Sequence, residues 1–177
     1  GMLGRPEALA LRSEIEELAQ KYQTTAMVIF PVGEDRAIIT DVVERQSPLR
    51  LKIDVGETFD SFVGAYGRCF AAASGLSKKA LRDRFSQIVW EEPLSFETYY
   101  EQVQQAKIDG YAIDAGDHMT GVLKISAAVC GTDGQARLAL SVLAFTAKFS
   151  KSECRQVGAE LRDRADRIQR NAVMLGV

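Results

Sequence analysis

The sequence has little of the material that most catalytic and metal sites require. Histidine occurs once, as His118, and Cys69, Cys130 and Cys154 form no C-x-x-C pair. A His-rich zinc site is therefore excluded, and a Ser-His-Asp triad would have to use this one ring. The sequence also lacks G-x-S-x-G, G-x-x-x-x-G-K and H-E-x-x-H motifs. We expect no catalytic residues, no metal and no cofactor, and thus a protein that is not an enzyme.

Long apolar runs and clusters of one charge are also missing. No apolar stretch approaches the roughly 18 residues that a membrane span needs, and no signal peptide is visible. The 22 basic and 24 acidic residues nearly balance, without a Lys/Arg run, so we do not expect this chain alone to bind DNA. The scattered cysteines favour a reduced setting, and we expect a cytoplasmic protein with no membrane partner.

The length of 177 residues predicts a single domain. A chain of this size can bury roughly 70% of its unfolded surface, so it needs no disulfide or metal for stability. Because 46% of its residues are hydrophobic, it has ample material for one core.

Apolar spacing predicts the order helix, three strands, three helices, three strands, helix. The predicted helices are Glu7–Tyr22, Ser61–Ala73, Ser77–Val89, Phe96–Asp109 and one that opens at Ser150, with Glu153 completing a capping box. The predicted strands are Thr24–Phe30, Arg36–Val43, Leu49–Ile53, Tyr111–Ile113, Val122–Val129 and Ala136–Phe145. Hairpin connections favour antiparallel pairing and therefore a mixed α/β (α+β) domain. The first and last helices could cover the sheet or pair with a second copy.

The two longest predicted strands carry polar residues on one face only. Side chains alternate along a strand, so the apolar rows of 122–129 and 136–145 can lie together over the core. Lys124, Ser126 and Ser141 then converge on the opposite face. A lysine and two hydroxyls among apolar side chains suit a small carboxylic acid. The alternative is that Lys124 is a solvated lysine on an open sheet face.

Two neighbouring segments could complete such a pocket. The N-terminus of the helix at 61–73 presents free amides to an anion, and Gly64 and Gly67 would let a ligand approach. The same glycines could instead serve helix–sheet packing. Asp114 could accept hydrogen bonds or pair with Lys124, or it could be a turn residue. Asp114, His118 and Lys124 together allow an enzymatic alternative, although nothing indicates a nucleophile.

Four blocks of the sequence resemble the C-terminal effector-binding domain of IclR-family bacterial transcription regulators. They are LRLKIDVG at 49–56, GRCFAA at 67–72, DGYAID at 109–114 and GVLKISAAVCGTDGQARLALSV at 121–142. The resemblance implies a GAF-like fold, with about six mostly antiparallel strands flanked by helices and an effector pocket on one sheet face. Family members sense small metabolites, often organic or aromatic acids.

The resemblance also implies how such a domain acts. The family binds DNA through an N-terminal winged helix-turn-helix, which this chain lacks, and forms homodimers or tetramers. Residues 2–23 correspond to the linker helix, packed on the domain, and 24–177 to the effector-binding domain. The expected function is small-molecule sensing, with binding that modulates the DNA affinity of the missing domain. A purely structural oligomerisation module is a further alternative.

Carried over residue by residue, the resemblance gives a set of ligand-binding positions. Asp114 and Ser141 match polar contacts, and Ala65 and Tyr66 match backbone amides at a helix start. The matching apolar positions are Leu51, Phe59 and Val122.

The sequence departs from the family pattern inside the same pocket. Lys124 stands where many members have Cys, and Leu143 stands where many have a second Ser. With Ser126, these residues complete the predicted site. Lys124 could form a salt bridge with a carboxylate effector, or it could neutralise Asp114 so that the pocket prefers a neutral ligand.

Overall fold

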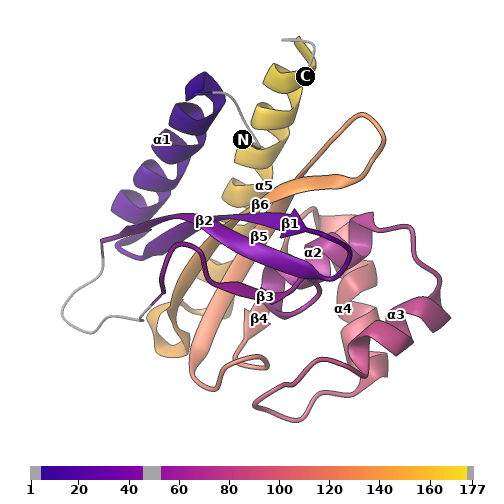
Figure 1. The fold of residues 1–177 in the computed structure, drawn as a ribbon. Coiled ribbons are helices and arrows are strands. Elements are labelled where there is room, and N and C mark those ends of the chain that lie inside the picture. The colour runs from indigo at the N-terminus through magenta and orange to yellow at the C-terminus, as the bar shows by residue number, and fades with distance from the viewer. Residues whose placement is uncertain (1–4, 46–52, 175–177) are drawn as a thin grey trace.

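The computed structural model describes residues 5–45 and 53–174 (Figure 1). The helices are α1 (Arg5–Tyr22), α2 (Gly64–Ala73), α3 (Lys78–Phe85), α4 (Phe96–Asp109) and α5 (Lys151–Met174), with a 3-10 turn η1 (Thr146–Lys148) before α5. The strands are β1 (Thr25–Val32), β2 (Arg36–Glu44), β3 (Thr58–Asp60), β4 (Ala112–Ala115), β5 (Val122–Cys130) and β6 (Ala136–Phe145). The predicted order is confirmed for the five helices and for every strand except the third, which lies at Thr58–Asp60 and was not predicted there.

The six strands form one sheet in the order β3-β2-β1-β6-β5-β4. Every neighbouring pair is antiparallel. Hairpin connections join β1 to β2 and β5 to β6, which brings the chain back beside itself with short loops. The predicted α+β class with a six-stranded antiparallel sheet is confirmed.

Several predicted boundaries differ from the structure. Strand β1 continues through Pro31, because its pairing with β6 ends at Ile29 and the proline lies opposite Ala37 of β2 alone. Helix α2 begins at Gly64 instead of Ser61, and α3 ends at Phe85 instead of Val89. The strand predicted at 49–53 lies mostly outside the described residues. Ile53 itself is not in a strand, and the third described strand is β3.

Helices cover both faces of the sheet (Figure 1). The face with Ile125, Ala127 and Val142 packs against α1 and α5, and the opposite face packs against α2 and α4, with α3 packed on α4. The register pairs Ile125 with Val142 and Ser126 with Ser141. The predicted division of β5 and β6 into an apolar face and a face with Lys124, Ser126 and Ser141 is therefore confirmed.

Helices α1 and α5 lie side by side and are joined by ion pairs (Figure 1). The Arg164 guanidinium contacts Glu14 at 2.7 Å and Glu17 at 2.6 Å. At the opening of α5, Ser150 and Glu153 exchange hydrogen bonds with each other's backbone amides, which confirms the capping box. Among the described helices, none is both long enough and apolar enough to cross a membrane.

Candidate functional site

Lys124 lies under α2, on the face of the sheet opposite α1 and α5. Its register partners are Asp114 on β4 and Leu143 on β6. Only 7% of the residue is exposed. The alternative of a solvated lysine on an open sheet face is therefore wrong, because the helical layer covers this part of β5.

The ammonium group of Lys124 contacts Nδ1 of His118. Since an ammonium can only donate, the imidazole accepts at Nδ1 and is neutral. Burial and the neighbouring Lys124 charge lower the pKa of His118 to about 4. Burial likewise lowers the pKa of Lys124 to about 8, although the Asp114 charge opposes this effect. The site thus holds a buried lysine whose direct partner carries no negative charge.

Asp114 organises the turn that follows β4. Its Oδ1 accepts hydrogen bonds from the amides of Gly116 at 3.0 Å and Asp117 at 2.7 Å, and its Oδ2 accepts from the His118 amide at 3.3 Å. The interpretation of Asp114 as a turn residue is confirmed. The three residues of the enzymatic alternative do lie together, but these amides occupy both Asp114 oxygens, so the carboxylate fixes the loop that carries His118.

Sequence reasoning did not single out Arg68, whose side chain is fully buried beneath this loop. The guanidinium donates to Asp117 Oδ2 at 2.9 Å and Gln102 Oε1 at 2.7 Å, and lies 3.6 Å from Asp114 Oδ2. It also donates to the Gly64 carbonyl at 2.9 Å. The only sequence signal was an arginine four residues after Gly64 on an otherwise apolar helix face.

The two glycines of α2 have different roles. Gly64 has φ +70°, and a Cβ there would lie 3.7 Å from Lys124 Nζ and 3.7 Å from Asp114 Oδ2. Gly67 has no room for a Cβ, because the Phe62 carbonyl carbon would be 2.0 Å away. Gly67 therefore serves close packing, but against the backbone of the turn before α2 and not against the sheet, as the packing alternative had it.

The two predicted hydroxyls contact each other. Ser126 Oγ and Ser141 Oγ are hydrogen-bonded across the β5–β6 pair, and both residues are buried. The Cys69 thiol on α2 donates to the Ser126 carbonyl at 3.3 Å, and burial raises its pKa to about 12. Cys69 is thus a packed, unreactive thiol. Ligand contact by Ser126 and Ser141 stays a prediction.

The other predicted site residues line the same layer, between the sheet and α2. Val122, Leu143 and Tyr66 are buried members of its apolar core, and Ala65 is fully buried beside Gly64. Phe59 is half-buried and meets the His118 ring edge-on, with ring centres 6.0 Å apart. Leu51 lies outside the described residues. The described members of the predicted site therefore lie together in one layer, and ligand binding by them stays a prediction.

A depression of about 240 Å³ opens beside His118. Its apolar lining comes from Phe59, Val63, Ile88 and Val89, and Arg36, Asp60 and Gln87 also border it. His118 therefore stands between this depression and the Lys124 ammonium, which it contacts.

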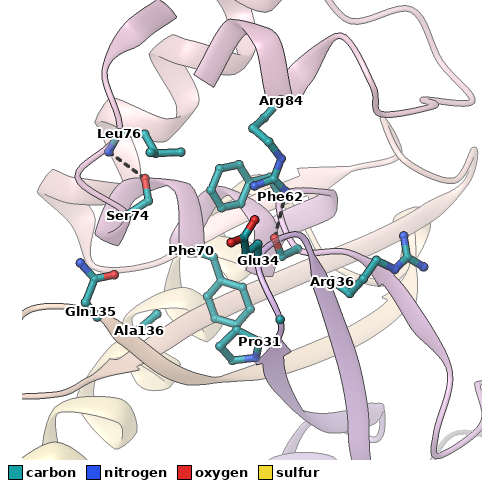
Figure 2. Close-up of a pocket in the computed structure, with 12 residues that line it drawn as sticks. Pro31, Glu34, Arg36, Phe62, Phe70, Ser74, Leu76, Arg84, Gln135 and Ala136 are labelled. Atoms are coloured by element: carbon teal, nitrogen blue, oxygen red, sulfur yellow. Dashed lines mark hydrogen bonds between the residues drawn. The ribbon is translucent and has the colours of Figure 1, made fainter. Parts of the chain in front are cut away.

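A second depression, of about 230 Å³, lies near the β1–β2 turn (Figure 2). The Arg84 guanidinium lies over the Phe62 ring, 4.1 Å from its centre, and donates to Ser61 Oγ at 3.0 Å. Arg84 is also paired with Asp60 at 3.1 Å. Among the predicted site residues that the structure describes, none lines this depression.

Acid is expected to destabilise the domain partly through His118. The unfolded imidazole titrates near 6.5 and the folded one near 4, so the unfolded state binds more protons between these values. Stability should therefore fall as the pH drops from 6.5 to 4, by on the order of 2 kcal/mol from this residue, after allowance for its partial exposure. Urea denaturation of the parent and His118→Gln at pH 7 and pH 4.5 measures the difference. Equal acid losses in both proteins would contradict the assignment.

Solved structures of bacterial transcription regulators share this fold. A regulator from Alicyclobacillus acidocaldarius is 22% identical, with a TM-score of 0.78 over 93% of this chain and 66% of that chain. The IclR of Thermotoga maritima is 15% identical, with a TM-score of 0.79 over 93% of this chain and 68% of that chain. A C-terminal regulator domain from Vibrio cholerae is 22% identical, with a TM-score of 0.72 over 92% and 96% of the two chains. These likenesses establish the fold.

The family follows from the sequence match. Residues 9–170 match the family described as the C-terminal domain of bacterial IclR transcriptional regulators. The chain therefore belongs to this family, and the resemblance identified from its four sequence blocks is confirmed. No curated protein matches the chain in sequence.

Proposed function

We propose that this domain senses a small organic acid in the cytoplasm for a transcription regulator. The observation that carries the proposal is the buried ammonium of Lys124 beside the depression at Phe59 and Val63, with an uncharged imidazole as its direct partner. A buried charge is costly in free energy unless it is paired. A carboxylate that pairs with Lys124 would therefore gain more free energy than the same ion pair gains in water.

The surrounding contacts offer a route from this site to the rest of the domain. The loop after β4 binds the segment before α4, with the amides of Glu91 and Glu92 donating to the carbonyls of His118 and Asp117. Arg68 ties α2 to both the loop and α4 through Asp117 and Gln102. A ligand that shifts this loop would therefore act on α2 and α4 together.

We further propose a larger assembly for the control of transcription. In the proposed assembly, residues 2–23 act as a linker helix to an N-terminal winged helix-turn-helix, and residues 24–177 form the effector-binding domain of a homodimer or tetramer. The packing of α1 beside α5 is compatible with a linker that responds to the sheet beneath it. Coupling between effector and DNA sites of this kind is typically about 1–3 kcal/mol.

Lys124→Met tests the proposal. Methionine keeps most of the length and the apolar character of the lysine stem, so we expect the fold to persist while binding of small carboxylates weakens by tenfold or more, about 1.4 kcal/mol. Thermal shift and calorimetry with a panel of monocarboxylates measure the effect. Lys107→Met, at an exposed position of α4, is the control and should bind as the parent does. A Lys124→Met protein that responds to the same acids as the parent shows that Lys124 is not the anion contact.

A further inference from the structure

We propose that His118 is a displaceable plug: its imidazole holds the place on Lys124 that the effector's carboxylate takes. The effector is then a monocarboxylate whose apolar body lies in the depression along Phe59 and Val63. This inference rests on the proposed function, because it concerns the same site: it specifies that His118 occupies the site without ligand and which acids displace it.

The position of the His118 ring supports the plug. One ring nitrogen, Nδ1, contacts Lys124 Nζ, while the same residue borders the depression. An acid entering from the depression therefore meets the imidazole before it meets the ammonium. A carboxylate oxygen is an acceptor like Nδ1 but carries negative charge, and charge-assisted hydrogen bonds are roughly twice as strong as neutral ones.

The imidazole can leave without unfolding the loop. The backbone of His118 is held on both sides, by its amide to Asp114 Oδ2 and by its carbonyl to the Glu91 amide. The ring itself makes edge-on contacts, with centre distances of 6.0 Å to Phe59 and 6.3 Å to Trp90. Rotation of the side chain breaks these ring contacts and the contact with Lys124, and it leaves the backbone hydrogen bonds in place.

The charges around the site favour a monoanion. Arg68 and Lys124 are balanced by Asp114 and Asp117, and Glu91 adds a negative field at Lys124. One carboxylate can pair directly with the Lys124 ammonium, whose present partner is an uncharged imidazole. A second carboxylate on the same ligand would meet uncompensated repulsion from these acids, so dicarboxylates should bind more weakly than monocarboxylates.

The indole of Trp90 supplies a further donor beside the plug. Its Nε1 is buried and has no hydrogen-bond partner among the described residues, and its ring contacts His118. Buried donors are rarely left unpaired. A carboxylate has acceptor capacity beyond Lys124, so Trp90 is a second group that an acid in the place of His118 could satisfy.

The sequence provides two unique reporters of the plug, because His118 is the only histidine and Trp90 the only tryptophan. The probe is benzoate, with benzamide as its uncharged counterpart. Burial and Lys124 lower the pKa of His118 to about 4 in the closed site. With saturating benzoate, a histidine-ring NMR titration should give a pKa near the ordinary 6.5, and Trp90 fluorescence should change. Benzamide should do neither.

Binding measurements on variants separate the plug from the proposed function. His118→Ala should bind benzoate about tenfold more tightly than the parent at pH 7, and Lys107→Ala, at an exposed position of α4 away from the depression, should match the parent. Benzoate binding that depends on Lys124 but leaves the His118 pKa near 4 overturns the plug alone. Failure of benzoate to bind both the parent and His118→Ala overturns the plug and the organic-acid function together.

Discussion

Arg68→Met is expected to lower the free energy of unfolding by about 3–5 kcal/mol at pH 7, because it leaves buried carboxylates without their cation. Arg68 is fully buried, and it contacts Asp117 Oδ2 at 2.9 Å and lies 3.6 Å from Asp114 Oδ2. Methionine fills much of the same space, so loss of volume accounts for little of the expected change. Urea denaturation of the two proteins measures it.

The pH dependence of this loss distinguishes a missing charge from poor packing. Burial, and then the Asp114 charge, raise the pKa of Asp117, while Arg68 lowers it. Without Arg68 that pKa should rise further, so the folded variant takes up a proton at higher pH than the unfolded chain. The destabilisation by Arg68→Met should therefore shrink as the pH falls from 7 to 5. A loss that is the same at both pH values would indicate packing alone.

An arginine on the surface provides the control for this prediction. Arg82 pairs with Glu97 at 3.1 Å, and more than half of each side chain is exposed. Arg82→Met should change the free energy of unfolding by less than about 1 kcal/mol, since solvent screens exposed pairs. If Arg68→Met behaves in the same way, the cluster around Asp114 and Asp117 is not held by Arg68.

The same cluster shows why the site could be predicted only in part from the sequence. Alternation along β5 and β6 was sufficient to place Lys124, Ser126 and Ser141 on one face, because strand periodicity is local. It could not decide whether Lys124 is buried, because α2 covers that face from a distant part of the chain. The interactions of Arg68 depend on Gln102 and Asp117, which are 34 and 49 residues away in sequence.

The hydroxyls and the histidine show a second limit of sequence reasoning. Ser126 and Ser141 were predicted to face a ligand, but their mutual hydrogen bond depends on a register that only the folded sheet defines. His118 was considered as an acid or base, and its contact with Lys124 depends on how Asp114 folds the intervening loop. Local patterns therefore predicted which residues gather here, and tertiary contacts determine what each one does.

Gly67→Ala is expected to lower the free energy of unfolding by about 3 kcal/mol, although alanine is the better helix former by about 1 kcal/mol. The new Cβ would lie 2.0 Å from the Phe62 carbonyl carbon and 2.3 Å from its oxygen. Both obstructing atoms belong to the backbone, so the clash is relieved only by moving α2 or the turn before it. Urea denaturation measures the loss, and a variant as stable as the parent would contradict the close packing of α2.

The same substitution tests whether the position of α2 buries Lys124. If α2 moves away from the sheet, Lys124 and His118 regain solvent, and the burial that lowers both of their pKa values is reduced. The pKa of the single histidine should then rise from about 4 toward 6.5. Gly75→Ala is the matched control: it has φ +71° and no atoms within 4 Å of the added Cβ, so it should cost about 1 kcal/mol of backbone strain. Because this control leaves α2 in place, its histidine should titrate as in the parent.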